Sequence, residues 1–131
     1  MSEIVVERIR EYMGKNGMDG FFISRPVNVK YVSGYTGEDS YLFLTSDKKY
    51  FITDPRYTEQ VSYECPDFEI VEWRENYGSV PAAAGGLASK DGLKSLGFEA
   101  DHLVVDFYRK IEEKTKAELV PCTGVVEELR A

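Results

Sequence analysis

The sequence is poor in the residues that build metal centres and disulfide frameworks. Its 131 residues include one histidine, His102, and two cysteines, Cys65 and Cys122. Zinc sites need cysteines or histidines in closely spaced pairs, and no such pair occurs. We therefore expect a surface or helix-cap histidine and two ordinary thiols in a reducing compartment. The sequence predicts no metal site and no bound cofactor within this chain.

Long apolar runs and basic clusters are missing too. No stretch has the length of a transmembrane helix and no apolar leader segment follows Met1, so we predict a soluble, cytoplasmic protein with no membrane partner. The formal net charge is −7, and the lysines and arginines are interleaved with acids. Because binding to phosphates requires clustered cations, we also expect no nucleic acid partner.

Motifs of catalysis are equally scarce. The sequence has no G-x-S-x-G nucleophile turn, and the segment 34–37 lacks the lysine of a phosphate-binding loop. Three acids, Asp39, Asp54 and Asp106, lie near the ends of predicted elements, which leaves a Mg²⁺-dependent nuclease as an alternative. Asp54 is better explained as a helix cap, because Asp-Pro is a typical helix start. We predict no catalytic residue in this chain.

What the sequence does contain is an alternation of buried strands and amphipathic helices. In the first helix, apolar residues recur at the spacing of one helical face, at Val5, Ile9, Tyr12 and Met13. The pattern predicts helices over residues 2–15, 26–33, 55–64, 77–90, 102–115 and 124–131. It predicts strands over residues 20–24, 41–45, 49–53, 68–73, 93–98 and 118–121. The expected N-caps of three of the helices are Asp54, Asp101 and Thr123.

This order of elements predicts an α/β fold. Helices alternate with strands, and one hairpin over residues 41–53 supplies an antiparallel member, so we expect three α/β/α layers around a mixed sheet. Residues 1–131 are expected to form a single domain. The last predicted helix has an apolar face but no stop signal, which we interpret as continuation into a second domain.

Aromatic and basic residues at the ends of elements are the remaining candidates for a site. We expect Tyr35, Arg56, Tyr57 and Trp73 to be exposed there. Arg56 follows a strand and offers a planar fork for a carboxylate, although a neighbouring acid is an alternative partner for it. The loop around Tyr35 is too polar for a core and unusually aromatic for a spacer.

Two blocks of the sequence carry a family resemblance. They read Arg25-Pro26-x-Asn28-x-x-Tyr31-x-Ser33-Gly34-Tyr35-Thr36-Gly37 and Tyr50-Phe51-Ile52-Thr53-Asp54-x-Arg56-Tyr57-x-x-Gln60. In this order and spacing they resemble the creatinase/prolidase N-terminal domain, and residues 125–130 are similar to the segment that leads into the second domain of that family. The resemblance implies a ribonuclease H-like α/β/α fold. The run 82–86, of three alanines and two glycines, is poorer than expected for the helix it would occupy.

The resemblance also implies a function. It indicates the non-catalytic N-terminal domain of an Xaa-Pro aminopeptidase, an Xaa-Pro dipeptidase or a creatinase. A C-terminal metallopeptidase domain outside this chain would bind two divalent metal ions, usually Mn²⁺, and proline-containing peptides would be the substrates. The N-terminal domain would help to form a homodimer or larger oligomer and would close over the active site. Tyr35, Arg56 and Tyr57 would then face the substrate. The alternative is a catalytically inactive relative that serves as a protein- or peptide-binding module.

Overall fold

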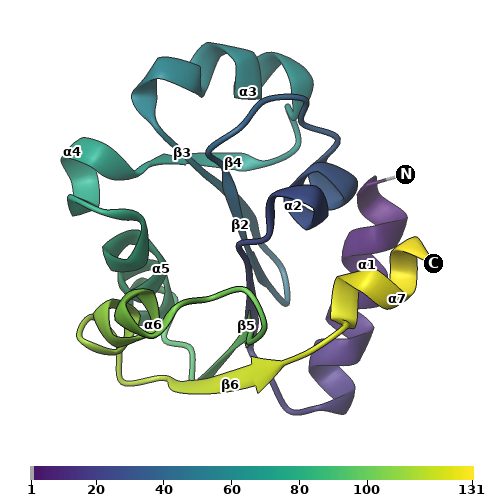
Figure 1. The fold of residues 1–131 in the computed structure, drawn as a ribbon, viewed down its shortest axis with the longest axis vertical. Coiled ribbons are helices and arrows are strands. Elements are labelled where there is room, and N and C mark those ends of the chain that lie inside the picture. Colours follow the sequence, from purple (N-terminus) through teal and green to yellow (C-terminus); the bar gives the residue numbers. More distant parts are fainter. Residues whose placement is uncertain (1) are drawn as a thin grey trace.

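One mixed six-stranded sheet forms the centre of the molecule, with helices on both faces (Figure 1). The structure is a computed structural model and describes residues 2–131. The strands are β1 (Gly20–Ile23), β2 (Tyr41–Thr45), β3 (Lys49–Thr53), β4 (Glu69–Glu72), β5 (Ser95–Glu99) and β6 (Glu118–Cys122). The helices are α1 (Ser2–Lys15), α2 (Pro26–Ser33), α3 (Thr58–Glu64), α4 (Trp73–Tyr77), α5 (Val80–Lys90), α6 (Val105–Glu112) and α7 (Val125–Arg130), and a 3₁₀ turn, η1 (Pro55–Tyr57), precedes α3. The predicted α/β class with a mixed sheet is confirmed.

The strand order, β4-β3-β2-β1-β5-β6, places the carboxyl ends of five strands together. β2 runs antiparallel to β1 and β3, as the predicted hairpin requires, whereas β1–β5, β5–β6 and β3–β4 are parallel pairs. Consequently β1, β3, β4, β5 and β6 all point the same way. We call the side on which they end the carboxyl end of the sheet. In open α/β sheets, ligands bind beyond this end of the strands.

Two apolar cores lie on opposite faces of the sheet because side chains alternate along each strand. On one face, strand residues such as Phe21, Leu42 and Phe51 pack with α1, α2, α3 and α7. On the other, Phe22, Phe43 and Ile52 pack with α5 and α6. β2 and β3 are therefore apolar on both sides, which explains their nearly continuous hydrophobic sequence.

The predicted boundaries of two elements around Trp73 are wrong, and a short helix between them was not predicted. β4 stops at Glu72, and Trp73 opens α4 instead of closing the strand. The helix predicted over residues 77–90 is found as α5 but begins only at Val80, because Gly78 adopts a left-handed φ of 86° that ends the separate short helix α4 at Tyr77. Ser79 then caps α5 by accepting a hydrogen bond from the Ala82 N–H at 3.2 Å. A glycine followed by serine was a stop and start signal within the apolar pattern.

The helix predicted over residues 102–115 is shorter and is not capped by Asp101. It begins at Val105, and its N-cap, Val104, makes no side-chain cap bond. Asp101 instead forms an ion pair with Arg25 at 3.1 Å. Thr123 is not a cap either, because the N-cap of α7 is Gly124 with a φ of 79°. By contrast Asp54 does cap η1, as predicted. Asp101 thus pairs with a residue distant in the sequence and does not cap the helix that follows it.

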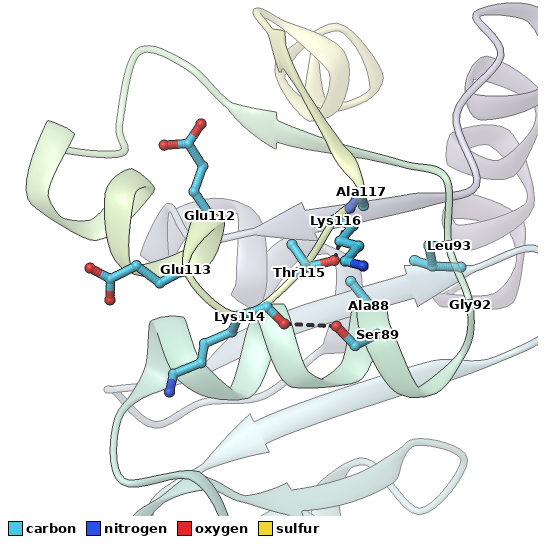
Figure 2. A pocket seen from close by; sticks show the side chains of 10 residues that line it. All are labelled: Ala88, Ser89, Gly92, Leu93, Glu112, Glu113, Lys114, Thr115, Lys116 and Ala117. Carbon is cyan, nitrogen blue, oxygen red and sulfur yellow. Dashed lines mark hydrogen bonds between the residues drawn. The ribbon is translucent and has the colours of Figure 1, made fainter.

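The small residues of α5 allow close packing between helices. A Cβ added to Gly85 would lie 2.6 Å from the Lys114 Cβ and 2.8 Å from the Ile111 carbonyl oxygen. Ser89, further along α5, donates a hydrogen bond of 2.7 Å to the Lys114 carbonyl oxygen (Figure 2). An open groove of about 680 Å³ lies beside this contact. A side chain larger than hydrogen at position 85 would therefore not fit against Ile111 and Lys114 without a shift.

Candidate functional site at the carboxyl end of the sheet

Asp54 is a buried carboxylate that forms ion pairs with two arginines, Arg56 and Arg74. It follows β3, and its side chain is only 2 % exposed. Its Oδ1 accepts hydrogen bonds from the Arg56 N–H at 2.9 Å and from the Arg56 Nε at 3.1 Å. Its Oδ2 accepts from Arg74, through Nε at 3.1 Å and through Nη2. One buried carboxylate therefore holds two guanidinium groups.

These contacts stabilise the ionised form of Asp54. The Arg56 backbone N–H donor lowers the pKa most, and the Arg74 and Arg56 side chains lower it further, whereas burial opposes them. The resulting pKa is about 2, against an ordinary value of 3.8. Asp54 is thus an anion near neutral pH, where its charge attracts both arginines.

Both arginines are exposed and rest on aromatic rings. The side chains of Arg56 and Arg74 are 65 % and 55 % exposed. The Arg56 Cζ lies 5.1 Å from the centre of the Tyr57 ring, and the Arg74 Cζ lies 4.7 Å from the centre of the Trp73 ring. Such contacts attract a cation to the ring face. Tyr57 packs against the core on one face of the sheet and Trp73 against the core on the other, so the arginines approach Asp54 from both sides.

Arg74 is a member of the site that the sequence reasoning missed. β3 and β4 are parallel neighbours, with Thr53 opposite Glu72, so the residues that follow both strands meet at the carboxyl end of the sheet. The available signal was a Trp-Arg pair directly after a strand, close to the Asp-x-Arg-Tyr segment after another. This signal places Arg74 beside Asp54 only if β3 and β4 are known to be neighbouring strands.

Tyr35 does not lie exposed at this site, contrary to our expectation. It is 2 % exposed, and its ring meets Phe51 edge-on, with centroids 5.0 Å apart. A Cβ on Gly37 would lie 2.6 Å from the Tyr35 ring, so the loop closes over the ring only because residue 37 is glycine. Burial raises the pKa of Tyr35. The prediction was wrong because an aromatic residue in a polar loop was read as exposed, whereas it fills the core below.

The loop after α2 is tied to α3. The backbone N–H of Thr36 donates to Glu64 Oε1 at 2.8 Å, and this bond is the main cause of a lowered Glu64 pKa. Gly34 ends α2 with a φ of 79°, and Lys30 pairs with Glu38 at 2.9 Å. The polar residues of the loop therefore serve to fix its conformation, while Arg56 and Tyr57 are the predicted candidates that the structure brings together.

A second buried carboxylate, Glu99, ends β5 at the same end of the sheet. It is 5 % exposed and accepts hydrogen bonds from the Ser24 and Arg25 N–H groups, each at 2.8 Å. Nearby, His102 Nδ1 lies 2.8 Å from the Ser24 hydroxyl, and His102 is exposed and not part of a helix, so of its two predicted roles the structure shows the surface histidine and not the helix cap. Ser24 is itself buried, with 2 % of its surface exposed.

Among residues 2–131, no three or more histidine, cysteine, aspartate or glutamate side chains gather in a way that would hold a metal ion. Within the same residues, no helix combines the length and the apolar character needed to span a bilayer.

Comparison with known proteins establishes the family. The model of the creatinase/prolidase N-terminal domain matches residues 6–131, and the chain belongs to this family. An uncharacterized peptidase, YqhT, of Bacillus subtilis strain 168 is 36 % identical over 126 residues, which are 95 % of this chain and 35 % of that protein. The Xaa-Pro dipeptidase from Bacillus anthracis superposes with a TM-score of 0.90 at 30 % identity, over 99 % of this chain and 36 % of that one.

An isolated domain of similar size also matches. The N-terminal domain of the cytoplasmic peptidase PepQ from Mycobacterium tuberculosis H37Rv has a TM-score of 0.87 and 30 % identity, over 97 % of this chain and 98 % of that one. The chain therefore corresponds to an N-terminal domain of the Xaa-Pro peptidase type, as the resemblance implied. It spans about a third of the length of the first two relatives.

Proposed function

We propose that this chain is the non-catalytic N-terminal domain of an Xaa-Pro metallopeptidase of the aminopeptidase P or prolidase type. The observation that carries the proposal is the match of nearly the whole chain to the N-terminal part of the Xaa-Pro dipeptidase from Bacillus anthracis. In such an enzyme this domain contributes to oligomerisation and to substrate access. The enzyme is proposed to be cytoplasmic, and the cytoplasmic peptidase among the relatives supports this.

The chemistry of hydrolysis belongs to another part of the enzyme. We propose that two divalent metal ions, Mn²⁺ in the first instance, activate the water there. Residues 2–131 contain no set of metal-ligating side chains that fits these ions, so their ligands belong to the C-terminal catalytic domain of the proposed enzyme.

The contribution of this domain to the substrate is proposed to be the arginine pair held by Asp54. The Nη donors of Arg56 make no bond in the described residues, and its guanidinium is exposed beside Tyr57. A planar guanidinium can donate two parallel hydrogen bonds to a peptide carboxylate or carbonyl, which lysine cannot imitate. Tyr35 supports the loop from below and does not contact the peptide.

The test uses the full-length protein that carries this domain. Purified with Mn²⁺, it is expected to hydrolyse the bond before proline in short peptides. Replacement of Arg56 by alanine should lower kcat/KM roughly ten- to a hundredfold through the loss of charged hydrogen bonds to the substrate. Arg109→Ala is the matched control, because Arg109 is exposed on α6 and forms no ion pair at the carboxyl end of the sheet.

Two outcomes would contradict parts of the proposal. Absence of turnover with retained peptide binding would favour the inactive binding module. Unchanged kcat/KM in Arg56→Ala, with the same fraction of folded protein, would remove the arginine pair from the substrate site but leave the peptidase assignment intact.

A further inference from the structure

The last helix, α7, is too short to define its own direction. It has six residues and begins at Gly124 without a side-chain cap. Isolated helices of this length are unstable in water, so tertiary contacts must hold α7 in place. Its apolar contribution is small: Val125 and Val126 are buried, and Leu129 packs on the same core. Apolar contact is non-directional and leaves the orientation of so short an element weakly determined.

Two hydrogen bonds and an ion pair to α7 come from α2 and the residue before it. The Tyr31 hydroxyl donates to the Leu129 carbonyl oxygen at 2.9 Å. The Asn28 Nδ2 donates to Glu127 Oε2 at 2.9 Å. The Arg25 Nε lies 3.2 Å from the same Glu127 oxygen, an ion pair whose angle is not that of a hydrogen bond. These contacts hold α7 at its middle and near its end.

Asn28 joins α7 to the sheet. It is fully buried, and its Nδ2 also donates to Glu99, the buried carboxylate that ends β5. With both amide hydrogens on carboxylates, its Oδ1 is left buried without a partner. An unsatisfied buried acceptor lowers stability, so an apolar residue here would avoid that cost. The residue is therefore better explained by the two carboxylates that it connects than by a contribution to packing.

The three residues share a regular spacing. Arg25, Asn28 and Tyr31 recur every third position, so they form one row along the side of α2 that faces α7. They belong to the first of the two sequence blocks that carry the family resemblance, a block that the proposed substrate site does not use.

We propose that Arg25, Asn28 and Tyr31 form a brace that fixes the direction of α7 relative to the sheet. Glu127 and the Leu129 carbonyl group are the points at which the brace holds α7. In a relative that is about three times as long, the chain after this domain would continue from α7, and the brace would set the direction in which it leaves. The direction of α7 itself does not depend on the peptidase activity proposed above.

The experiment measures α7 in the 131-residue chain. Tyr31→Phe removes one hydroxyl and keeps the packed ring. Amide hydrogen exchange of Glu128 and Ala131, whose N–H groups bond to Gly124 and Glu127, should become roughly fivefold faster, as expected for the loss of one hydrogen bond. Residual dipolar couplings of the α7 amides should change relative to those of β1 and β5, and more so in the double variant Tyr31→Phe/Glu127→Ala.

Tyr50→Phe is the matched control. The Tyr50 hydroxyl donates to Asp91 at 2.8 Å, a bond of similar length far from α7. This change should leave the couplings of α7 as they are in the unsubstituted chain. Unchanged couplings in the double variant would overturn the brace, because apolar packing alone would then orient α7. Equal acceleration of exchange in α7, β1 and β5 would overturn it as well, since the bonds would then serve only global stability.

Discussion

At the scale of single residues, Asp54 has two roles, of which the sequence indicates only the first. It caps the 3₁₀ turn after β3, as the Asp-Pro dipeptide indicates, and it also pairs with arginines from two elements. The cap is a local interaction between neighbours in the sequence. The pairing with Arg74 spans 20 residues and exists only because β3 and β4 are parallel neighbours.

The pKa of Asp54 gives a pH prediction. Because its folded-state pKa of about 2 lies below the ordinary 3.8, the unfolded chain binds the proton more readily. The stability that Asp54 contributes is thus fully present above about pH 4 and is lost as the pH falls toward 2. Thermal melts of the unsubstituted chain and of Asp54→Asn should differ in Tm near pH 6, and the difference should narrow between pH 4 and pH 2.

The melts of the two proteins must be compared at each pH, because other carboxylates also become protonated between pH 4 and pH 2 and lower the Tm of both. Asp54→Asn keeps an oxygen that can accept from the Arg56 N–H, but its NH2 group replaces the oxygen that accepts from Arg74, so the variant loses hydrogen bonds as well as the charge. The pH dependence of the Tm difference, and not its size, therefore reports the charge. A Tm difference that stays constant down to pH 2 would show that the Asp54 charge contributes nothing to stability.

At the scale of elements, we predict that replacing glycine by alanine has opposite effects on stability in α5 and in α1. Gly85→Ala improves helix propensity but forces a Cβ against the Ile111 carbonyl and the Lys114 Cβ. Overpacking against backbone outweighs the propensity gain, and we expect a net loss of about 1–2 kcal/mol in the free energy of unfolding.

Gly14→Ala is the control in α1. A Cβ on Gly14 would meet nothing within 4 Å, so this variant should be more stable by about 0.5 kcal/mol. Urea unfolding of both variants measures the two changes. If Gly85→Ala were as stabilising as Gly14→Ala, α5 and α6 would not be held as close as the structure shows.

At the scale of the whole molecule, the chain has what an independent domain needs. Both faces of its sheet are covered, and each face has its own core. We predict a single cooperative thermal transition, with coincident curves by far-UV and near-UV circular dichroism. Two separated transitions, or binding of a hydrophobic dye before melting, would contradict a self-sufficient domain.

The same reasoning predicts that the isolated chain is inactive. With no metal-ligating cluster in its described part, purified 131-residue protein should not hydrolyse Xaa-Pro peptides, with or without Mn²⁺. Activity that persists through repeated purification would refute this. The measurement also complements the assay of the full-length protein, where turnover is expected.

The sequence by itself determined the elements whose signals are local. The apolar periodicity of α1, the hairpin of β2 and β3 and the Asp54 cap depend on residues close together in the chain, and the structure confirms all three. The two sequence blocks also led to the family, because the order and spacing of motifs can be read from the sequence without knowing the fold.

Only the tertiary structure decided which of the motif residues are available for function. Tyr35 and Arg56 look alike in the sequence as polar or aromatic residues at element ends, yet one is buried and the other is exposed. Arg74 joined the site, and Asp101 left its helix, through partners distant in the sequence. The physical reason is common to these cases. Exposure and ion pairing depend on strand order and on which face of the sheet an element covers. Strand order and helix placement are in turn decided by the joint packing of apolar residues from segments that are distant in the sequence.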